Sequence, residues 1–280
     1  MSAGSPSRAN VAAGKISLWM PDPERALDQA LADTFPASDP VGLMPEPNRQ
    51  PGVASALLLP VHAQRLELTR HMRVEQVFAA IAANCIQHIR ANEVAVVSGT
   101  GMESLHQMRV GVRRLCSGFK LFGECFLPPQ AMWRELLALQ TTLGAARDWD
   151  VLLDQTLAAL SLAHPGLAGL AALRVAASEQ RAASRHAVMQ ALSSQDYTDL
   201  FDGLNQWCAR RGWRQTLLPG ERKFIRGAID KVADKLLDVH QTNLLKRGRK
   251  LRRHDDEVRH RARIAAKKVR YDSEFLQSLY

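Results

Sequence analysis

The sequence predicts an all-α protein, and its composition and patterning both support that fold class. Hydrophobic residues make up 46% of the 280 residues, whereas aromatic residues make up only 6%. Alanine and leucine supply most of the apolar residues, and both lose little entropy in a helix. The nearest candidate for a β-strand, residues 95–97, is too short to carry weight. We therefore expect helices and no substantial sheet.

Residues 1–56 form a leader that differs from the rest of the chain. The leader is rich in Pro, Ser and Gly, and residues 1–60 hold four basic residues against six acidic ones. Prolines break up any long helix, at Pro21, Pro23, Pro36, Pro40, Pro45, Pro47 and Pro51. We predict that the leader is mostly disordered and that residues 57–280 form the folded domain.

The first two helices of the domain are expected at 61–92 and 104–126. A Ser-Gly-Thr-Gly run, 98–101, separates them. Ser104 is the expected N-cap of the second helix, which two prolines end.

Turn signals divide the remaining chain into shorter helices. A helix over 131–143 is expected to end at Gly144, and Asp148 is expected to cap the next helix, 148–162. Arg147, Asp148 and Asp150 then have a structural interpretation, as a helix start with a capping carboxylate and an ion pair. The later helices are expected at 167–192, 197–210, 221–237 and 255–280.

The charge of the chain indicates an acidic partner. The formal net charge is +9 and the sequence pI is about 9.8. This balance suits a nucleic acid, an anionic membrane or another polyanion, and does not choose among them. No apolar run approaches the roughly 20 residues that span a bilayer, and no secretory signal is recognisable, so we expect a cytoplasmic protein. The four cysteines have no zinc-ligand spacing and are expected to be buried free thiols: Cys85, Cys116, Cys125 and Cys208.

One motif occurs twice, 154 residues apart. The segments 106–114 and 260–268 both read H-x-x-R-x-x-x-(R/K)-(R/K). At helical spacing, each copy places a cationic row on one face and apolar residues on the opposite face. We therefore expect each helix to dock by its apolar side and to present its cations on the other. The rows contain His106, Arg109, Arg113 and Lys120 in the first copy, and His260, Arg263 and Lys267 in the second, which Arg249 and Arg253 extend backwards.

A solvated basic face is the ordinary explanation for one such row. Two copies at a fixed offset, each led by histidine, favour a binding role instead, because mixed-sign pairs would serve solubility better. The region of the second copy is also unusually basic: residues 246–270 hold twelve basic residues against three acidic ones.

These segments resemble the CHAD family, the conserved histidine α-helical domain. The resemblance rests on the segments 105–115, 143–151 (Leu-Gly-Ala-Ala-Arg-Asp-Trp-Asp-Val) and 260–274. It implies two related four-helix bundles with an internal pseudo-twofold repeat, a first repeat over 57–195 and a second over 196–280. The second Leu-Gly-x-x-Arg-Asp turn would fall beyond Tyr280, so we expect the second bundle to be truncated at the C-terminus.

The resemblance also implies a ligand. Members of the family bind inorganic polyphosphate in a basic groove or cavity and are associated with cytoplasmic polyphosphate granules, where granule-associated proteins would be further partners. The residues carried over are His106, Arg109, Arg113, Arg114, His260, Arg263, Lys267, Lys268 and Arg270; Lys120, Arg249 and Arg253 are added from helix geometry. Cys116 stands where the repeat predicts a basic residue matching Arg270, so the first copy is expected to bind less strongly there.

Two other functions are weighed against polyphosphate binding. Sequence-independent nucleic-acid binding is the alternative that charge permits, although no aromatic residues are interleaved with the basic rows. A polyphosphate hydrolase would need carboxylates to hold Mg²⁺ beside the phosphates, and the rows contain almost none. We therefore expect a protein that is not an enzyme, with no catalytic residue, metal or cofactor.

Overall fold

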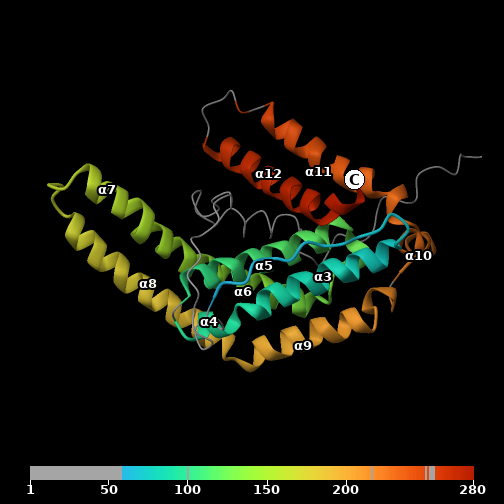
Figure 1. Cartoon of the computed structure of the whole chain (residues 1–280), viewed down its shortest axis with the longest axis horizontal. Coiled ribbons are helices and arrows are strands. Elements are labelled where there is room, and N and C mark those ends of the chain that lie inside the picture. The colour runs from blue at the N-terminus through green and yellow to red at the C-terminus, as the bar shows by residue number, and fades with distance from the viewer. Residues whose placement is uncertain (1–58, 100, 216, 250, 252–255) are drawn as a thin grey trace, which may run out of the picture.

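The computed structural model describes residues 59–99, 101–215, 217–249, 251 and 256–280. Every regular element in these ranges is a helix, apart from one isolated bridge between Arg73 and Ala228. The predicted all-α fold is therefore confirmed (Figure 1). Within the same ranges, no helix is long and apolar enough to cross a membrane. The leader, 1–56, lies outside the described residues.

Four helices form a closed bundle at the centre of the molecule. They are α3 (Val74–Ala91), α5 (Met102–Leu121), α6 (Gln130–Val151) and α9 (Gln195–Ala209). Helices α3 and α6 each pack against both α5 and α9, so the four close around one core (Figure 1). The short helix α4 (Glu93–Val97) links α3 to α5 and packs on both.

Aromatic rings fill the end of this bundle where α3 begins. The Phe78 ring lies 4.3 Å from Phe126, 5.1 Å from Trp213 and 5.7 Å from Phe119, between centroids. The sequence sets this up, because Val74, Phe78 and the apolar residues that follow recur at helical spacing along one face of α3. Each buried ring contributes about 1.5–3 kcal/mol relative to exposure, so this cluster is a main source of stability.

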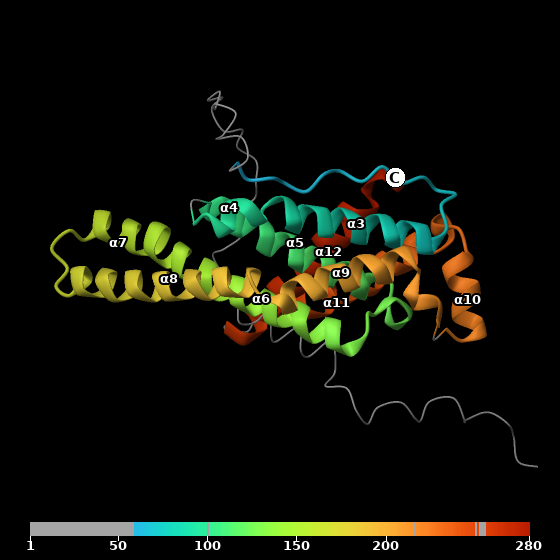
Figure 2. The same cartoon turned by 90° about the horizontal axis from the view of Figure 1, so that it is seen from below.

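A helical hairpin projects from the bundle. Helix α6 passes through a π turn, Leu152–Thr156, into α7 (Leu157–Ala163), and α8 (Leu170–Leu192) returns alongside it. We call residues 152–192 the arm; it extends beyond the bundle in both views (Figures 1 and 2). Its small core is separate from that of the bundle and consists of Leu153, Leu157, Leu170 and Ala177.

The second half of the domain adds α10 (Pro219–Arg226), α11 (Ala233–Gly248) and α12 (Asp256–Leu276). Helices α11 and α12 pack against each other, and α12 also packs against α5 (Figure 1). Residues of α12 such as Phe275 belong to the same core as the four-helix bundle. Helix α9, which the predicted second repeat (196–280) includes, packs in the first bundle; the division at residue 195 stays a prediction.

The chain before α3 differs from the helix expected at 61–92. Only Val74–Ala91 is helical, and residues 59–70, which we call the strap, run along α3 without regular structure. The Asn92 side chain holds the strap, because its Oδ1 accepts from the Val61 N–H at 3.0 Å and its Nδ2 donates to the Val61 carbonyl at 2.8 Å. Side-chain amides thus satisfy backbone groups that a helix would have paired internally.

Two other expected boundaries are wrong. Gly144 and Asp148 lie inside α6 and do not separate two helices. Glycine costs a helix interior about 1 kcal/mol, and the burial of Leu143 and Ala146 beside it offsets that cost. The helix expected at 221–237 is broken at Gly227, whose carbonyl accepts from the Val74 N–H at 3.0 Å.

Candidate anion-binding site

The two copies of the motif lie on helices that touch. The Arg113 guanidinium is 5.7 Å from the centre of the Tyr271 ring, and that of Arg114 is 5.1 Å from the Phe275 ring. Farther along both helices, a Cβ on Gly118 would lie 3.8 Å from the Phe275 ring. Residue numbers therefore rise in the same direction on α5 and α12, and the two helices run roughly parallel (Figure 1). Segments 154 residues apart in the chain therefore lie side by side.

Acidic residues are scarce on both helices where the motif lies. Glu103, in the first turn, is the only acid of α5, and residues 258–271 of α12 contain none. The Glu103 carboxylate accepts from Gln107 Nε2 at 2.7 Å. The cations of the two neighbouring helices together raise the local positive potential, and a positive potential favours an anionic ligand. We call the following residues the paired-helix site: His106, Arg109, Arg113, His260, Arg263, Lys267 and Lys268.

The row on α5 is buried, which corrects the expectation that it would be presented to solvent. Arg109 is 0% and Arg113 1% exposed, and His106 is also buried. The reason is that α5 packs against α3, α4, α6 and α12, so few of its positions remain open. Helix α5 also begins at Met102, which places Ser104 inside the helix and not at its cap. Buried guanidinium groups need compensating anionic or hydrogen-bonding partners to offset desolvation.

The row on α12 is more open. Arg263 is exposed, and His260 and Lys267 are half-buried. Lys268 is buried one turn before Asp272, and its charge acts to lower the pKa of that carboxyl, as does His240 of α11. Burial is the larger effect, so the pKa of Asp272 lies above its usual value. Asp272 Oδ2 is hydrogen-bonded to the Nδ1 of His240, so Lys268 lies one turn before a polar link between α11 and α12.

Arg114 and Arg270 converge on one carboxylate. Arg114 NH1 lies 3.2 Å from Glu274 Oε2, and Arg270 Nε lies 3.3 Å from Glu274 Oε1. Arg270 also stacks over the Tyr271 ring at 4.9 Å. The Arg114–Glu274 contact links α5 to α12, whereas the contacts of Arg270 lie within α12. A direct role for the two arginines in holding an anion stays a prediction.

The residues added from helix geometry lie at the margins. Lys120 is half-buried in the last turn of α5, and Arg249 is exposed at the end of α11. Arg253 lies outside the described residues. A ligand-binding role for Lys120, Arg249 and Arg253 stays a prediction.

The Arg147–Asp150 segment is part of the packing between α6 and α8. Arg185 of α8 donates to Asp150 Oδ1 through NH2 at 2.8 Å and Nε at 3.2 Å. Burial raises the pKa of Asp150, against the opposing charge of Arg185. Asp150 therefore forms an ion pair, but its partner is Arg185 of α8, and the pair joins two helices in place of marking a helix start.

Sequence reasoning missed two features, one at the site and one in the core. The guanidinium groups of Arg113 and Arg270 both lie against the Tyr271 ring, and the position of Tyr271 one turn after Lys267 was a sequence signal for such a contact. Gln140 of α6 is 1% exposed, and neither atom of its amide has a hydrogen-bond partner. A lone Gln in an apolar stripe gives no sequence signal of this kind.

This protein is a helical bundle in which two helices with the same histidine-and-arginine motif lie side by side. Its family follows from two comparisons: the sequence profile of the CHAD domain matches residues 80–280, and the chain is similar to the crystal structure of the CHAD domain from the plant Ricinus communis. That likeness has 39% sequence identity and a TM-score of 0.69, over 79% of this chain and 72% of the plant chain. No curated protein matches the chain. The chain belongs to the CHAD family.

Proposed function

We propose that this protein binds inorganic polyphosphate at the paired-helix site. The observation that carries the proposal is the contact between α5 and α12, which brings two copies of one cationic motif together. Membership of the CHAD family supports it. The absence of acidic residues over 104–121 and 258–271 supports a polyanion as the ligand.

The residue types suit a phosphate chain. Arginine offers a planar fork of donors that pairs with two phosphate oxygens, and lysine supplies a compact charge. Phosphate units are alike along the chain, so rows of cations can hold it in many registers. Histidines His106 and His260 would gain charge beside phosphate, so binding should be tighter at about pH 6 than at about pH 8.

The proposal is one of binding without hydrolysis. The two motif helices carry cations where Mg²⁺ would require carboxylates. We further propose that the protein works in the cytoplasm at polyphosphate granules, with granule-associated proteins as partners. Phosphate release from polyphosphate in the presence of Mg²⁺ would contradict the first part, and imaging of the tagged protein beside stained granules tests the second.

Titration with long-chain polyphosphate and with duplex DNA, at several salt concentrations, tests the binding itself. The first variant is Arg263→Gln with Lys267→Gln, chosen on the more open helix so that folding is preserved. The matched control is Arg65→Gln with Arg174→Gln, which removes two charges from exposed positions on the strap and the arm. Each lost phosphate contact should reduce the slope of log affinity against log salt by about 1.

We expect the first variant to bind polyphosphate roughly a hundredfold or more weakly, since it removes two charge-assisted contacts that contribute about 1.5–3 kcal/mol each. The control should stay close to wild type, and duplex DNA should bind much more weakly than polyphosphate. Equal loss in both variants would mean that net charge, and not the paired-helix site, attracts the ligand. Equal binding of DNA and polyphosphate would favour a general nucleic-acid-binding role.

A further inference from the structure

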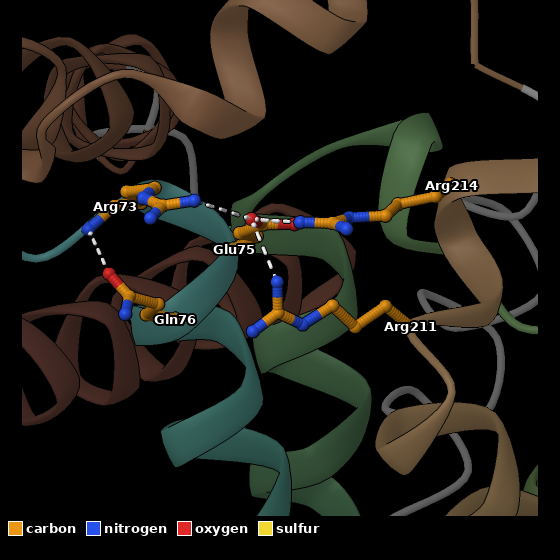
Figure 3. A network of polar contacts seen from close by, with 5 residues as sticks. All are labelled: Arg73, Glu75, Gln76, Arg211 and Arg214. Atoms are coloured by element: carbon orange, nitrogen blue, oxygen red, sulfur yellow. Dashed lines mark hydrogen bonds and ion pairs between the residues drawn. The ribbon is translucent and has the colours of Figure 1, made fainter.

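A second group of arginines lies around the first turn of α3. Three guanidinium groups surround the carboxylate of Glu75 (Figure 3). Arg214 donates to both of its oxygens, with Nε at 2.8 Å from Oε2 and NH2 at 2.5 Å from Oε1. Arg211 NH1 lies 3.3 Å and Arg73 NH1 3.7 Å from Oε1. We call Arg73, Arg211 and Arg214 the arginine cluster.

One carboxylate does not neutralise this cluster. The Glu75 side chain is 1% exposed, whereas those of Arg73, Arg211 and Arg214 are 53%, 44% and 39% exposed. Two positive charges are therefore left over, on groups that reach solvent. Two hydrogen bonds to Glu75 orient Arg214, and Arg211 and Arg73 lie within ion-pair distance of the same carboxylate. Part of the side-chain entropy is therefore already lost before an anion binds.

The surroundings add to the positive potential. Arg210 is exposed beside Arg211, and Arg226 is exposed next to Gly227, whose carbonyl accepts from Val74. The cluster also lies at the N-terminus of α3, where the helix dipole favours negative charge. Two acids follow the cluster, Glu221, whose carboxylate accepts from the Leu218 N–H, and the exposed Asp230. Helix α9, which ends just before Arg210, has three more, all within its first eight residues and therefore toward its far end.

The cluster and the paired-helix site are well separated along α3. His88, near the end of α3, is hydrogen-bonded to Gln107 of α5 at 3.2 Å, whereas Glu75 lies in the first turn. The separation of 13 positions between Glu75 and His88 corresponds to about 20 Å of helix. A short phosphate chain would occupy one of these places, whereas a long chain could reach both.

We propose that the arginine cluster is a second phosphate-binding site, which holds another stretch of the polyphosphate chain bound at the paired-helix site. The inference rests on the proposed function and extends it. Binding at two places on one protein makes the second contact intramolecular, so long chains gain affinity that short chains do not. The protein then prefers long polyphosphate chains over short ones without recognising either end of the chain.

Arg73→Gln combined with Arg211→Gln tests this site. Arg214 and its two bonds to Glu75 are kept, so the fold should survive, and a thermal melt checks that. Arg73→Lys with Arg211→Lys keeps the charge, and Arg65→Gln with Arg174→Gln is the matched loss of two charges elsewhere. Each protein is titrated with long-chain polyphosphate and with tripolyphosphate.

We expect the glutamine variant to bind long-chain polyphosphate roughly tenfold more weakly than wild type, with a salt slope lower by about 2. The lysine variant should keep the salt slope. The ratio of long-chain to tripolyphosphate affinity should fall in the glutamine variant and not in the Arg65/Arg174 control. If the glutamine variant matches that control, the second site is wrong while polyphosphate binding stands. If wild type binds neither polyphosphate, the proposed function and the second site are both wrong.

Discussion

Cys116 of α5 is fully buried, whereas Arg270, which occupies the matching position of α12 154 residues later, has a side chain that is 42% exposed. A second pair shows the same contrast, because Phe119 is buried where α12 has the exposed Ser273, whereas Gly111 and its counterpart Ala265 are both buried. Helix α5 lies inside a closed bundle, and α12 packs on α11 and α5. The motif is therefore shared, but the packing around it decides which neighbouring positions can carry charge.

Exchanging the residues at the Cys116 and Arg270 positions should give the largest effect. Burial raises the pKa of the Cys116 thiol to about 12, as expected for apolar surroundings. Cys116→Arg should cost about 3–5 kcal/mol, because it buries a charge without a partner. Arg270→Cys should cost about 1 kcal/mol or less, since it removes a surface ion pair. Urea unfolding measures the free energy of unfolding of both variants. Similar losses in the two would contradict the difference in packing between α5 and α12.

A smaller effect should appear as a dependence of stability on pH. Burial, with the nearby charge of Arg114, lowers the pKa of His88 to about 4. The folded state therefore binds a proton less readily than the unfolded chain, so stability is full above about pH 6.5 and falls as the pH drops towards 4. His88 alone should cost about 2 kcal/mol between pH 7 and pH 5.

Urea unfolding across this pH range measures the effect of His88. The variant His88→Gln should lose less stability on acidification than wild type. His186→Gln, an exposed histidine of the arm, should behave like wild type. Identical pH profiles for all three proteins would show that His88 is not held neutral beside α5.

Close packing of α5 on α3 predicts a further asymmetry. A Cβ on Gly111 would meet Ile89 Cγ1 at 2.7 Å and the Ile89 backbone nitrogen at 3.3 Å. Gly111→Ala should therefore cost about 1–2 kcal/mol, although alanine favours helix by about 1 kcal/mol. Ala265→Gly, the reverse change in α12, should cost about 1 kcal/mol. A more stable Gly111→Ala protein would mean that α3 and α5 can separate freely.

The smallest predicted effect concerns the ionic link between the two copies. A double-mutant cycle of Arg114→Gln and Glu274→Gln should give a coupling of about 0.5–1 kcal/mol, because Glu274 is partly exposed. Raising the salt concentration should reduce that coupling. A coupling near zero would leave ring contacts such as Arg114 over Phe275 as the link between α5 and α12.

The sequence was enough to predict the fold class, the family and the two motif helices, because amphipathic spacing is a local property. It did not predict which face of α5 would be covered, since α12, which covers part of it, comes 154 residues later. Cys116 illustrates the limit: the repeat marks it as a departure that weakens binding, whereas the packing shows a core position.

Local stop signals failed where tertiary contacts outweighed them. Gly144 and Asp148 read as a helix boundary, yet they lie within a helix that packs on three neighbours. The arginine cluster at Glu75 was not predictable either, because Arg73 and Arg211 lie on different elements and neither belongs to a motif. Only the fold brings them to one carboxylate.

The π turn at Leu152–Thr156 has a consequence for the whole arm. Leu143, Asp150 and Leu157 are spaced seven residues apart, and a regular α-helix would align them along one side. A π turn accommodates a surplus residue and so rotates everything after it by about 100°. After the turn, Leu157 packs with Leu153, Leu170 and Ala177 in the core of the arm. Deleting a single residue here should rotate α7 about its own axis and break its packing against α8. Substituting a side chain could not produce that rotation.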